Sequence, residues 1–473
     1  MRRHASCTWT RSMRACDVSD DLLRRLAVPG PRYTSYPPAN MWGDLAALDY
    51  DVALGAAAAA TARAGAADLP ASLYVHVPFC RLRCAYCGLN VSGARDPRVH
   101  ARYVDAVVAE AVAVQARAGG RLRAVEVAWG GGTPTSLEAA ELARLAAGVT
   151  AAIPLLPGAR LSVEVDPRVT TPDKLRALAA AGFRRVSLGV QDLDPEVQAA
   201  AGRVQGEEES RRCLEAARDA GFEGANVDLM YGLPRQNTAE LRRTVERVLA
   251  WAPERVTLFG YAHLPARFPN QRRIAAADLP GPRARLDLLL EAAATLGAHG
   301  YRWLGLDHFV REDDELWRAH RAGTLGRNFM GYVPARAATM VGLGASSIGE
   351  VHGTFVQNER EVGPYEARVA SGGLATARGY RLRGDDALRA DVIERLMCDL
   401  AVDLAATGVR HGVDGETYFA RALTELRPLA ALGLVEVSGA RVQVTPLGRL
   451  FLRNVCMAFD GHRGSGAQHA STV

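Results

Sequence analysis

Lysine is almost absent from this 473-residue sequence, since Lys174 is the single example and arginine carries nearly all of the positive charge. The sequence also lacks an apolar run long enough to span a membrane: the Ala-rich stretch 55–67 is short and is interrupted by Arg63. The first residues, MRRHASCTWTRSMRACD, have no apolar core of the kind that a signal peptide needs. We therefore expect a cytoplasmic protein with no membrane partner and no stable disulfides, in which 55–67 forms a surface helix.

The bulk composition is that of an ordinary globular protein. Hydrophobic residues make up 48% and charged residues 23%, which excludes a mostly disordered chain. The formal charge of +5 is small for this length, and no basic run is interleaved with aromatic residues, so we expect no nucleic-acid partner. The arginines suit a small anionic ligand. We also expect the protein to be a monomer. Nothing before Met13 is typical of a structured segment, so either Met1 or Met13 is the start.

Short β-branched runs alternate with helical segments between residues 72 and 309. This spacing is typical of successive βα units around a parallel sheet, and predicts a partial TIM-type (β/α) barrel with parallel strands. Helix-start signals follow the strands: Thr135 with Glu138, Thr171 before Pro172, and Asn237 with Glu240. The strands that we expect are 72–77, 124–129, 160–167, 184–192, 224–234, 255–265 and 302–309.

The pattern at the two ends of the chain differs from that of the barrel. We expect an N-terminal extension and arm over 1–60, the barrel domain over 61–310, a barrel-completing segment over 311–369 and a small, mostly helical C-terminal domain over 370–473. The C-terminal domain should contain helices at 386–406 and 415–432 and a small β wing that turns at Ser438 and Gly439. The wing has no basic recognition helix beside it, which favours a structural or lid role over DNA binding.

Polar residues cluster where the expected strands end. In βα barrels the active site lies at this carboxyl-terminal rim, so these side chains are candidates for a site, although each alone could be structural. The rim candidates are Glu164, Gln191, Asp192, Asp228, His263, Asp307 and His308.

Three of the eight cysteines, Cys80, Cys84 and Cys87, lie in one loop directly after the first expected strand. Three thiolates can ligate three irons of a 4Fe-4S cluster and leave the fourth iron open to a small molecule. The alternative is a zinc site with His76 as fourth ligand, but no second Cys pair follows. The remaining cysteines are scattered and are typical of buried or incidental thiols: Cys7, Cys16, Cys213, Cys398 and Cys456.

The second expected strand ends in three consecutive glycines, Gly130, Gly131 and Gly132. Glycines at a strand end let a ligand approach the backbone, and their N–H groups can bind a carboxylate or phosphate. Together with the cysteine loop, they indicate a site for a cofactor that carries a carboxylate.

These motifs resemble those of the radical S-adenosylmethionine superfamily: Cys-x3-Cys-x2-Cys after a first strand, Tyr86 before the third cysteine, and GGGTP after the second strand. Over nearly its whole length the chain resembles the oxygen-independent coproporphyrinogen III oxidases. The matching stretches include PRYTSYP at 31–37, LYVHVPFC at 73–80, NVDLMYGLP at 226–234, RNFMGY at 327–332 and RNVCMAFD at 453–460.

The resemblance implies a 4Fe-4S cluster on Cys80, Cys84 and Cys87, and two S-adenosylmethionine molecules. It implies that the first molecule contacts Tyr74, Gly131, Glu164 and Ile348. It implies that the second contacts Tyr86, Gly132, Thr133, Gln191, Arg203, Asp228 and Ala262.

The implied reaction is oxidative decarboxylation of two propionates of coproporphyrinogen III to vinyl groups by a 5′-deoxyadenosyl radical, giving protoporphyrinogen IX for haem. An unidentified electron donor such as flavodoxin or ferredoxin would reduce the cluster. Arginine suits a substrate with four carboxylates. The arginines that we considered for this are Arg32, Arg272, Arg327 and Arg453.

The sequence departs from the family at Leu89, where these oxidases usually have a fourth cysteine. One interpretation is an altered activity or another tetrapyrrole substrate; the other, which we favour, is a tolerated substitution. Two further hypotheses are a haem-binding chaperone on the same fold, and a radical enzyme that methylates or opens haem. Related chaperones typically lack the YTSYP arm and the RNVCMAFD tail that this chain has.

Overall fold

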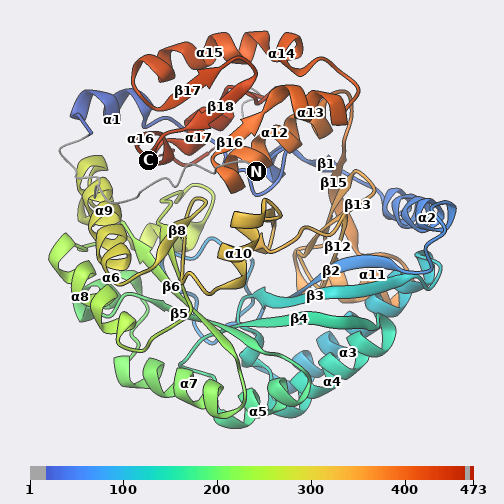
Figure 1. The fold of residues 1–473 in the computed structure, drawn as a ribbon. Helices are drawn as coiled ribbons and strands as arrows, with labels where there is room; N and C mark the ends of the chain where they lie inside the picture. Colours follow the sequence, from blue (N-terminus) through green and yellow to red (C-terminus); the bar gives the residue numbers. More distant parts are fainter. Residues whose placement is uncertain (1–17, 464–468, 473) are drawn as a thin grey trace.

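The computed structural model describes residues 18–463 and 469–472, so Met13, Cys7 and Cys16 lie outside the described residues. Within that part, one thirteen-stranded sheet forms the centre of the molecule, and its middle strands are all parallel (Figure 1). This confirms the predicted partial (β/α) barrel. The parallel strands, in spatial order, are β12 (Thr339–Leu343), β2 (Leu69–Val77), β3 (Leu122–Gly131), β4 (Leu155–Val165), β5 (Arg185–Gln191), β6 (Gly224–Tyr231) and β7 (Arg255–Gly260).

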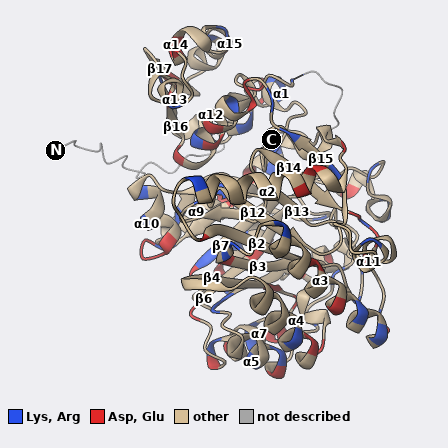
Figure 2. Ribbon diagram, turned by 90° about the vertical axis from the view of Figure 1, so that its right-hand side faces the viewer, with Lys and Arg blue, Asp and Glu red and all other residues tan. Residues whose placement is uncertain are grey.

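Helices between these strands cover the outer face of the sheet (Figure 1). Positively and negatively charged residues are interspersed along the outer helices (Figure 2). The helices that follow the parallel strands are α3 (Pro97–Arg117), α4 (Ala139–Ala152), α5 (Pro172–Ala180), α6 (Pro195–Ala201), α7 (Glu207–Asp219), α8 (Thr238–Leu249) and α9 (Pro282–Ala298).

Residue alternation along β5 separates the apolar outer layer from a polar lumen. In β5, Val186, Leu188 and Val190 are buried under the helices, whereas Ser187 faces the lumen and is partly exposed. Each fully buried Val or Leu side chain contributes about 1.5–3 kcal/mol of hydrophobic free energy. The barrel is therefore held together from outside, which leaves its lumen available for polar side chains.

Two of the three predicted helix starts are confirmed. The Thr171 hydroxyl caps α5 by accepting from Lys174 N, and the Asn237 side chain caps α8 by accepting from Glu240 N. The predicted helix start at Thr135 with Glu138 is wrong. Thr135 lies in a short 3-10 helix, Pro134–Ser136, and its hydroxyl is hydrogen-bonded to Thr170; Glu138 is itself the residue that precedes α4.

The sheet does not close into a full barrel, because antiparallel strands extend both of its edges. The predicted single strand at 302–309 is wrong: a turn at Gly305, with φ of +54°, divides it into the hairpin β8 (Arg302–Leu304) and β9 (His308–Val310), and β9 pairs with β7. At the other edge lie β13 (Ile348–Val351), β14 (Thr354–Asn358), β15 (Thr376–Arg381) and β1 (Gly43–Asp44).

Paired charges close the amino-terminal end of the barrel, where α10 (Glu315–Ala322) begins. Asp314 accepts from Arg255 at 2.7 Å and lies 3.4 Å from Arg185. Glu315 lies 2.8 Å from Arg255 and 3.9 Å from Arg160. Figure 1 shows α10 in the middle of the ring of strands.

The C-terminal unit contains helices around a three-stranded sheet. The predicted helix at 386–406 is wrong: α12 (Asp386–Asp399) ends at Leu400, whose φ is +56°, and β16 (Ala401–Asp403) pairs with β18 before α13 (Leu404–Arg410) begins. The predicted helix at 415–432 is interrupted at Phe419, between α14 (Gly415–Tyr418) and α15 (Ala420–Ala431). The predicted wing hairpin is confirmed, with β17 (Val435–Ser438) and β18 (Arg441–Val444).

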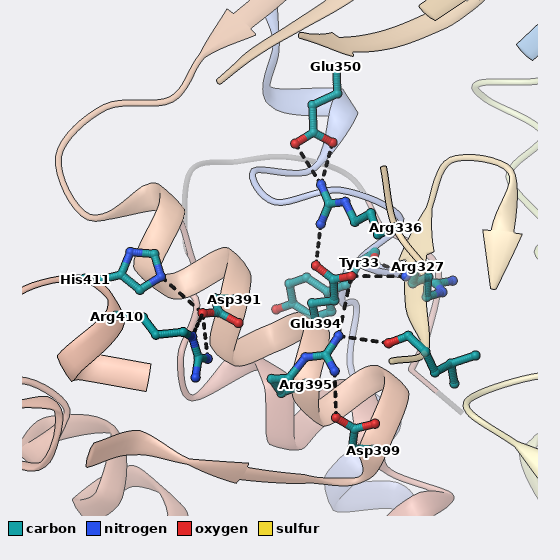
Figure 3. Close-up of polar contacts among 11 residues, drawn as sticks. Tyr33, Arg327, Arg336, Glu350, Asp391, Glu394, Arg395, Asp399, Arg410 and His411 are labelled. Carbon is teal, nitrogen blue, oxygen red and sulfur yellow. Dashed lines mark hydrogen bonds and ion pairs between the residues drawn. The ribbon is translucent and has the colours of Figure 1, made fainter. Parts of the chain in front are cut away.

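Ion pairs on α12 join the C-terminal unit to the barrel (Figure 3). Glu394 accepts from Arg327 N at 3.1 Å and from the Arg336 guanidinium, which also contacts Glu350 of β13 at 2.6 Å. Next to it, Arg395 donates to Leu325 O at 2.9 Å. The remaining helices and strands of the chain include β10 (Gly326–Asn328), β11 (Gly331–Val333), α11 (Val362–Ala370), α16 (Pro446–Arg449) and α17 (Leu452–Met457).

Buried arginines hold the N-terminal arm through its backbone carbonyls. Arg453 of α17 donates to Pro31 O at 2.9 Å and to Gly30 O, and Arg327 donates to the carbonyls of Arg32 and Tyr33. The arm begins with α1 (Asp20–Leu26) and continues into α2 (Ala47–Arg63), which contains most of the predicted surface helix. None of the helices in the described ranges has the length and apolarity to cross a membrane.

Candidate active site

The three clustered cysteines lie in the loop between β2 and α3, at the carboxyl-terminal rim of the barrel. Two backbone hydrogen bonds join the start of the loop to Ser92: Cys80 N donates to Ser92 O at 3.0 Å, and Ser92 N donates to Pro78 O at 2.7 Å. Cys87 N then donates to Cys84 O at 3.4 Å in a tight turn. Cys84 is buried, Cys80 and Cys87 are partly exposed, and all three are free thiols.

Each sulfur faces a hydrogen-bond donor. The Thr133 hydroxyl lies 3.5 Å from Cys80 Sγ, Leu89 N donates to Cys87 Sγ at 3.4 Å, and Arg203 Nη1 lies 3.7 Å from Cys84 Sγ. Donors at sulfur favour thiolates and stabilise a negatively charged iron–sulfur cluster. The three thiols in this loop can therefore act as the ligands of a 4Fe-4S cluster, with one iron left for another ligand.

Burial raises the pKa of Cys80 to about 11, and the nearby charges of Cys87 and Cys84 add to this. Burial also raises the pKa of Cys87, and Cys84 contributes there too. The three thiols thus lie within electrostatic reach of one another. Because thiolates are the metal ligands, iron binding must release these protons at neutral pH.

A zinc site with His76 does not fit this geometry. His76 Nε2 is hydrogen-bonded to Asn90 O at 3.1 Å and Nδ1 lies 3.2 Å from the Tyr74 hydroxyl, so both ring nitrogens are engaged. Burial lowers the pKa of His76 to about 4, which keeps the ring neutral. Within residues 18–463 and 469–472, no group of three His, Cys, Asp or Glu side chains has the geometry to hold a single metal ion.

Two residues that the sequence did not single out hold the cysteine loop in place. Asn270 Nδ2 donates to the carbonyls of Cys84, Ala85 and Cys87 at 2.9–3.2 Å. Gln271 Nε2 donates to Tyr86 O and Ala262 O. Both lie in the 3-10 helix Pro269–Arg273, about 180 residues along the chain, and no local motif marks them.

The three glycines at the end of β3 make room mainly for the protein itself. A Cβ on Gly130 would lie 2.6 Å from Glu164 Oε2, one on Gly131 2.5 Å from the His76 ring, and one on Gly132 2.5 Å from Pro78 O. Gly131 N donates to Glu164 Oε2 at 3.3 Å. The N–H that we expected to be available to a ligand therefore already contacts a carboxylate of the chain.

Glu164 of β4 and Asp228 of β6 lie within electrostatic reach of each other. The surrounding protein raises the pKa of Glu164 to about 7 and Asp228 adds to this, although water still reaches the Glu164 side chain from the lumen. Asp228 accepts from Ser187 Oγ at 3.0 Å and Asn226 Nδ2 at 2.7 Å, and burial raises its pKa. Carboxyl groups of raised pKa in a polar lumen are typical of a functional site.

The other predicted cofactor contacts lie around the same rim. Arg203 is buried, donates to Gly189 O at 2.7 Å and Asp166 Oδ2 at 3.2 Å, and its Nε has no partner among the described residues. Gln191 ends β5 with φ of +71°. Tyr74 lies on β2, Tyr86 in the cysteine loop, Thr133 and Gly132 after β3, Ala262 after β7 and Ile348 on β13.

Three of the rim candidates have structural partners. Asp192 is buried and accepts from Thr244 and Gln236 at 2.8 and 2.6 Å. His263 is hydrogen-bonded to the Tyr261 hydroxyl. Asp307 is buried and contacts His308 at 2.9 Å and Arg32 at 3.3 Å, and these partners lower its pKa to about 2 in spite of burial.

All four arginines that we considered for the substrate are already bonded to oxygens of the chain. Arg32 pairs with Asp307, while Arg327 and Arg453 hold the arm. Arg272 lies 3.4 Å from Pro265 O.

A cavity of about 850 Å³ opens beside the cysteine loop, outside the lumen. Cys80 and Phe79 form part of its wall, so it comes close to the predicted cluster. Its charged lining includes Arg81, Arg95, Arg168, Lys174, Arg212, Glu138, Glu141 and Glu209.

Leu89 lies two residues beyond Cys87, with its side chain 55% exposed. Its backbone N–H, rather than its side chain, contacts the Cys87 sulfur. Any residue except proline supplies that N–H, so leucine in place of cysteine leaves this contact of the loop intact.

Comparisons with known proteins match both parts of the chain. Residues 74–248 match the radical SAM superfamily, and residues 382–451 match the HemN C-terminal domain. The oxygen-independent coproporphyrinogen III oxidase of Escherichia coli is 40% identical over 449 residues, which cover 95% of this chain and 96% of the relative. The enzyme of that name from Bradyrhizobium diazoefficiens is 41% identical over 444 residues, 94% of this chain and 97% of the relative.

A solved structure agrees with these relatives. Coproporphyrinogen III oxidase (HemN) from Escherichia coli, described as a radical SAM enzyme, superposes with a TM-score of 0.85 at 40% identity. The match covers 91% of this chain and 97% of that structure.

Proposed function

This chain belongs to the family of oxygen-independent coproporphyrinogen III oxidases, and from this premise we propose how its rim residues carry out the family's reaction. It is a radical SAM enzyme of haem biosynthesis. In its reaction, each of two propionate side chains of coproporphyrinogen III loses a hydrogen atom from the β-carbon, CO2 and one further electron, which an electron acceptor must take up. Each side chain thereby becomes a vinyl group, and the product is protoporphyrinogen IX. One observation supports this proposal most strongly. Three thiols, each with a hydrogen-bond donor beside its sulfur, lie in one loop above a lumen lined with carboxyl groups.

Cys80, Cys84 and Cys87 would hold the 4Fe-4S cluster. When bound, the cluster and S-adenosylmethionine supply the electron and the carbon radical that remove a hydrogen atom from the propionate β-carbon. The chain's own contribution is to hold the loop rigid through Asn270 and Gln271, so that the reacting groups keep one geometry.

We further propose that two S-adenosylmethionine molecules bind, at the residues that the family resemblance implies. The first would meet Tyr74, Gly131, Glu164 and Ile348. The second would meet Tyr86, Gly132, Thr133, Gln191, Arg203, Asp228 and Ala262. The ionised Glu164 carboxylate suits the ammonium group of the cofactor, and the unpartnered Arg203 Nε offers a donor. Equilibrium dialysis of the reconstituted protein should give two molecules per chain; one molecule would contradict this part.

We propose that the electron donor docks at the cavity beside Cys80, because this cavity reaches the predicted cluster from outside the lumen. The exposed Arg81 and Arg95 suit a small acidic carrier such as flavodoxin or ferredoxin. Arg81→Glu with Arg95→Glu should slow cluster reduction by flavodoxin and leave reduction by dithionite unchanged. Equal slowing with both reductants would contradict this docking site.

One assay tests the function itself. The anaerobically reconstituted protein, given reductant and coproporphyrinogen III, should form protoporphyrinogen IX and release CO2. Formation of 5′-deoxyadenosine without a vinyl product would contradict the oxidase function, and stable haem binding without turnover would instead favour a chaperone. The domain boundaries, the cytoplasmic location and the monomeric state stay predictions from the sequence.

A further inference from the structure

Arginines at the rim of the barrel fall into two groups. Most have an ion pair or a hydrogen bond to the chain, as Arg32 and Arg453 do. The side chains of Arg267 and Arg360 have neither within the described part of the chain, and both are exposed. Arg378 is partly buried and donates only to the carbonyls of Ala39 and Trp42 in the arm.

Arg267 and Arg360 lie on either side of the cysteine loop. Arg267 follows β7 and precedes Phe268, whose ring would lie 3.3 Å from a Cβ on Gly88. Arg360 follows β14, and its carbonyl accepts from Asn90 Nδ2 at 2.7 Å. Two different segments that carry these arginines therefore contact the residues that follow Cys87.

The register of the sheet places Arg378 on the lumen side of β15. Ile348 of β13 pairs with Gln357 of β14, and Gln357 pairs with Arg378. Residues that pair across neighbouring strands point to the same face of a sheet, so Arg378 shares the face of Ile348. The opposite face carries Val356, which packs in the main core under the helices.

The three arginines lie close enough together to repel one another. Burial lowers the pKa of Arg378, and the positive charges of Arg267 and Arg360 lower it further, against a weaker opposing contribution from Asp44. Asp44 of β1 pairs with Arg378 in the sheet and offsets part of this positive charge. The excess of like charge that remains destabilises the folded protein, whereas a bound anion would remove this cost. The amino-terminal end of the barrel has the opposite arrangement, because the lumen arginines there have carboxylate partners.

We propose that Arg267, Arg360 and Arg378 bind propionate carboxylates of the tetrapyrrole and so position the macrocycle over the cysteine loop. The inference rests on the proposed function, since it takes the four-carboxylate substrate from there. Guanidinium groups on three separate elements suit carboxylates that project from different sides of one large ring, and each planar fork can hold a carboxylate in two hydrogen bonds. Because Arg378 also binds the arm, the arm would be ordered together with the substrate site.

Binding of coproporphyrin III to the cluster-loaded protein tests this directly. This oxidised analogue keeps the four propionates and can be followed by its fluorescence. Arg267→Gln and Arg360→Gln should each raise its Kd about tenfold, and the double variant should raise it further. Arg267→Lys should restore part of the affinity. Arg427→Gln, an exposed arginine of α15, is the matched control and should bind like the unaltered protein.

Two further readouts separate charge recognition from damage to the fold. The tetramethyl ester of coproporphyrin III, which lacks the carboxylates, should bind equally to the double variant and the control. The variants should also raise KM for coproporphyrinogen III without lowering their unfolding temperature, because neither exposed side chain has an ion pair or hydrogen bond to lose within the described residues.

The outcomes distinguish this inference from the proposed function. If the double variant binds coproporphyrin III as tightly as the control, the carboxylate site is wrong, whether or not the protein makes the vinyl product. If the double variant loses binding but the unaltered protein forms no vinyl product, the carboxylate site stands and the oxidase function fails.

Discussion

The two ends of the barrel use the same residue type in opposite ways. At the amino-terminal end, Arg160, Arg185 and Arg255 are each paired with carboxylates of Glu126, Asp314 or Glu315. At the carboxyl-terminal rim, Arg267 and Arg360 have no such partner among the described residues, and Glu164 has a pKa raised to about 7. The paired end closes the fold, whereas the rim keeps some charges uncompensated and therefore available to ligands.

This difference explains where stability and function reside. A buried ion pair adds little net free energy, but loss of one partner leaves a costly unpaired charge. Substitutions at the paired end should therefore lower stability without changing the chemistry. Substitutions at the rim should change binding or chemistry and leave the unfolding temperature nearly constant.

The largest effect should come from the cysteine loop. Cys84→Ala removes one of three thiolates, so the protein should hold little iron and form no 5′-deoxyadenosine, with an unchanged far-ultraviolet circular dichroism spectrum. Iron and sulfide analysis after anaerobic reconstitution measures this. Cys213→Ala, a buried cysteine of α7 outside the loop, is the matched control and should keep its iron. A fully loaded, active Cys84→Ala protein would overturn the cluster assignment.

The next largest effect should be on stability, at the paired end. Asp314→Asn leaves Arg255 without its 2.7 Å partner, and should lower the free energy of unfolding by about 3 kcal/mol. The asparagine can still accept from Leu316 N and so keep the start of α10. Glu312→Gln, which breaks the exposed pair with Arg302, is the control and should cost less than about 1 kcal/mol. Equal losses measured by urea unfolding would contradict the role of the paired end.

A smaller effect concerns pH. The pKa of Glu164, raised from 4.5 to about 7, means that the carboxyl is neutral below pH 7 and ionised above it. If Glu164 contacts the cofactor ammonium, affinity for S-adenosylmethionine should rise about tenfold between pH 6 and pH 8. Calorimetric titration measures this, and Glu164→Gln should abolish the rise. The same pH dependence in Glu164→Gln would assign it to another group.

The smallest effect should follow from restoring the family's usual cysteine. Leu89→Cys replaces an exposed side chain whose backbone N–H already makes the contact to Cys87. Iron content and the rate of vinyl formation should match those of the unaltered protein. A gain in vinyl product would show that position 89 acts in the substrate reaction.

Local patterns predicted the parts of the fold that depend on neighbouring residues. The strand β5, the caps at Thr171 and Asn237, and the cysteine loop all follow from side chains close in sequence. The division of 302–309 at Gly305 and the end of α12 at Leu400 depended on pairing with β7 and β18, which no local pattern contains.

The site was predicted in the same uneven way. Cys80, Cys84 and Cys87 carry their own spacing, but Asn270 reaches the loop from about 180 residues away. The sequence position of an arginine did not show what the side chain contacts. Arg453 donates to backbone carbonyls, and only the register of β13, β14 and β15 shows that Arg378 shares a face of the sheet with Ile348. Such roles depend on tertiary contacts that bring distant segments together.

The most direct test of the contrast between the two ends is turnover of the Asp314→Asn protein. Vinyl formation per cluster-loaded chain should be measured at a temperature at which both this variant and the unaltered protein are fully folded. We expect equal rates, because Asp314 stabilises the closed end and takes no part in the chemistry at the rim. A clearly slower rate in the folded, loaded variant would contradict the separation of stability from function.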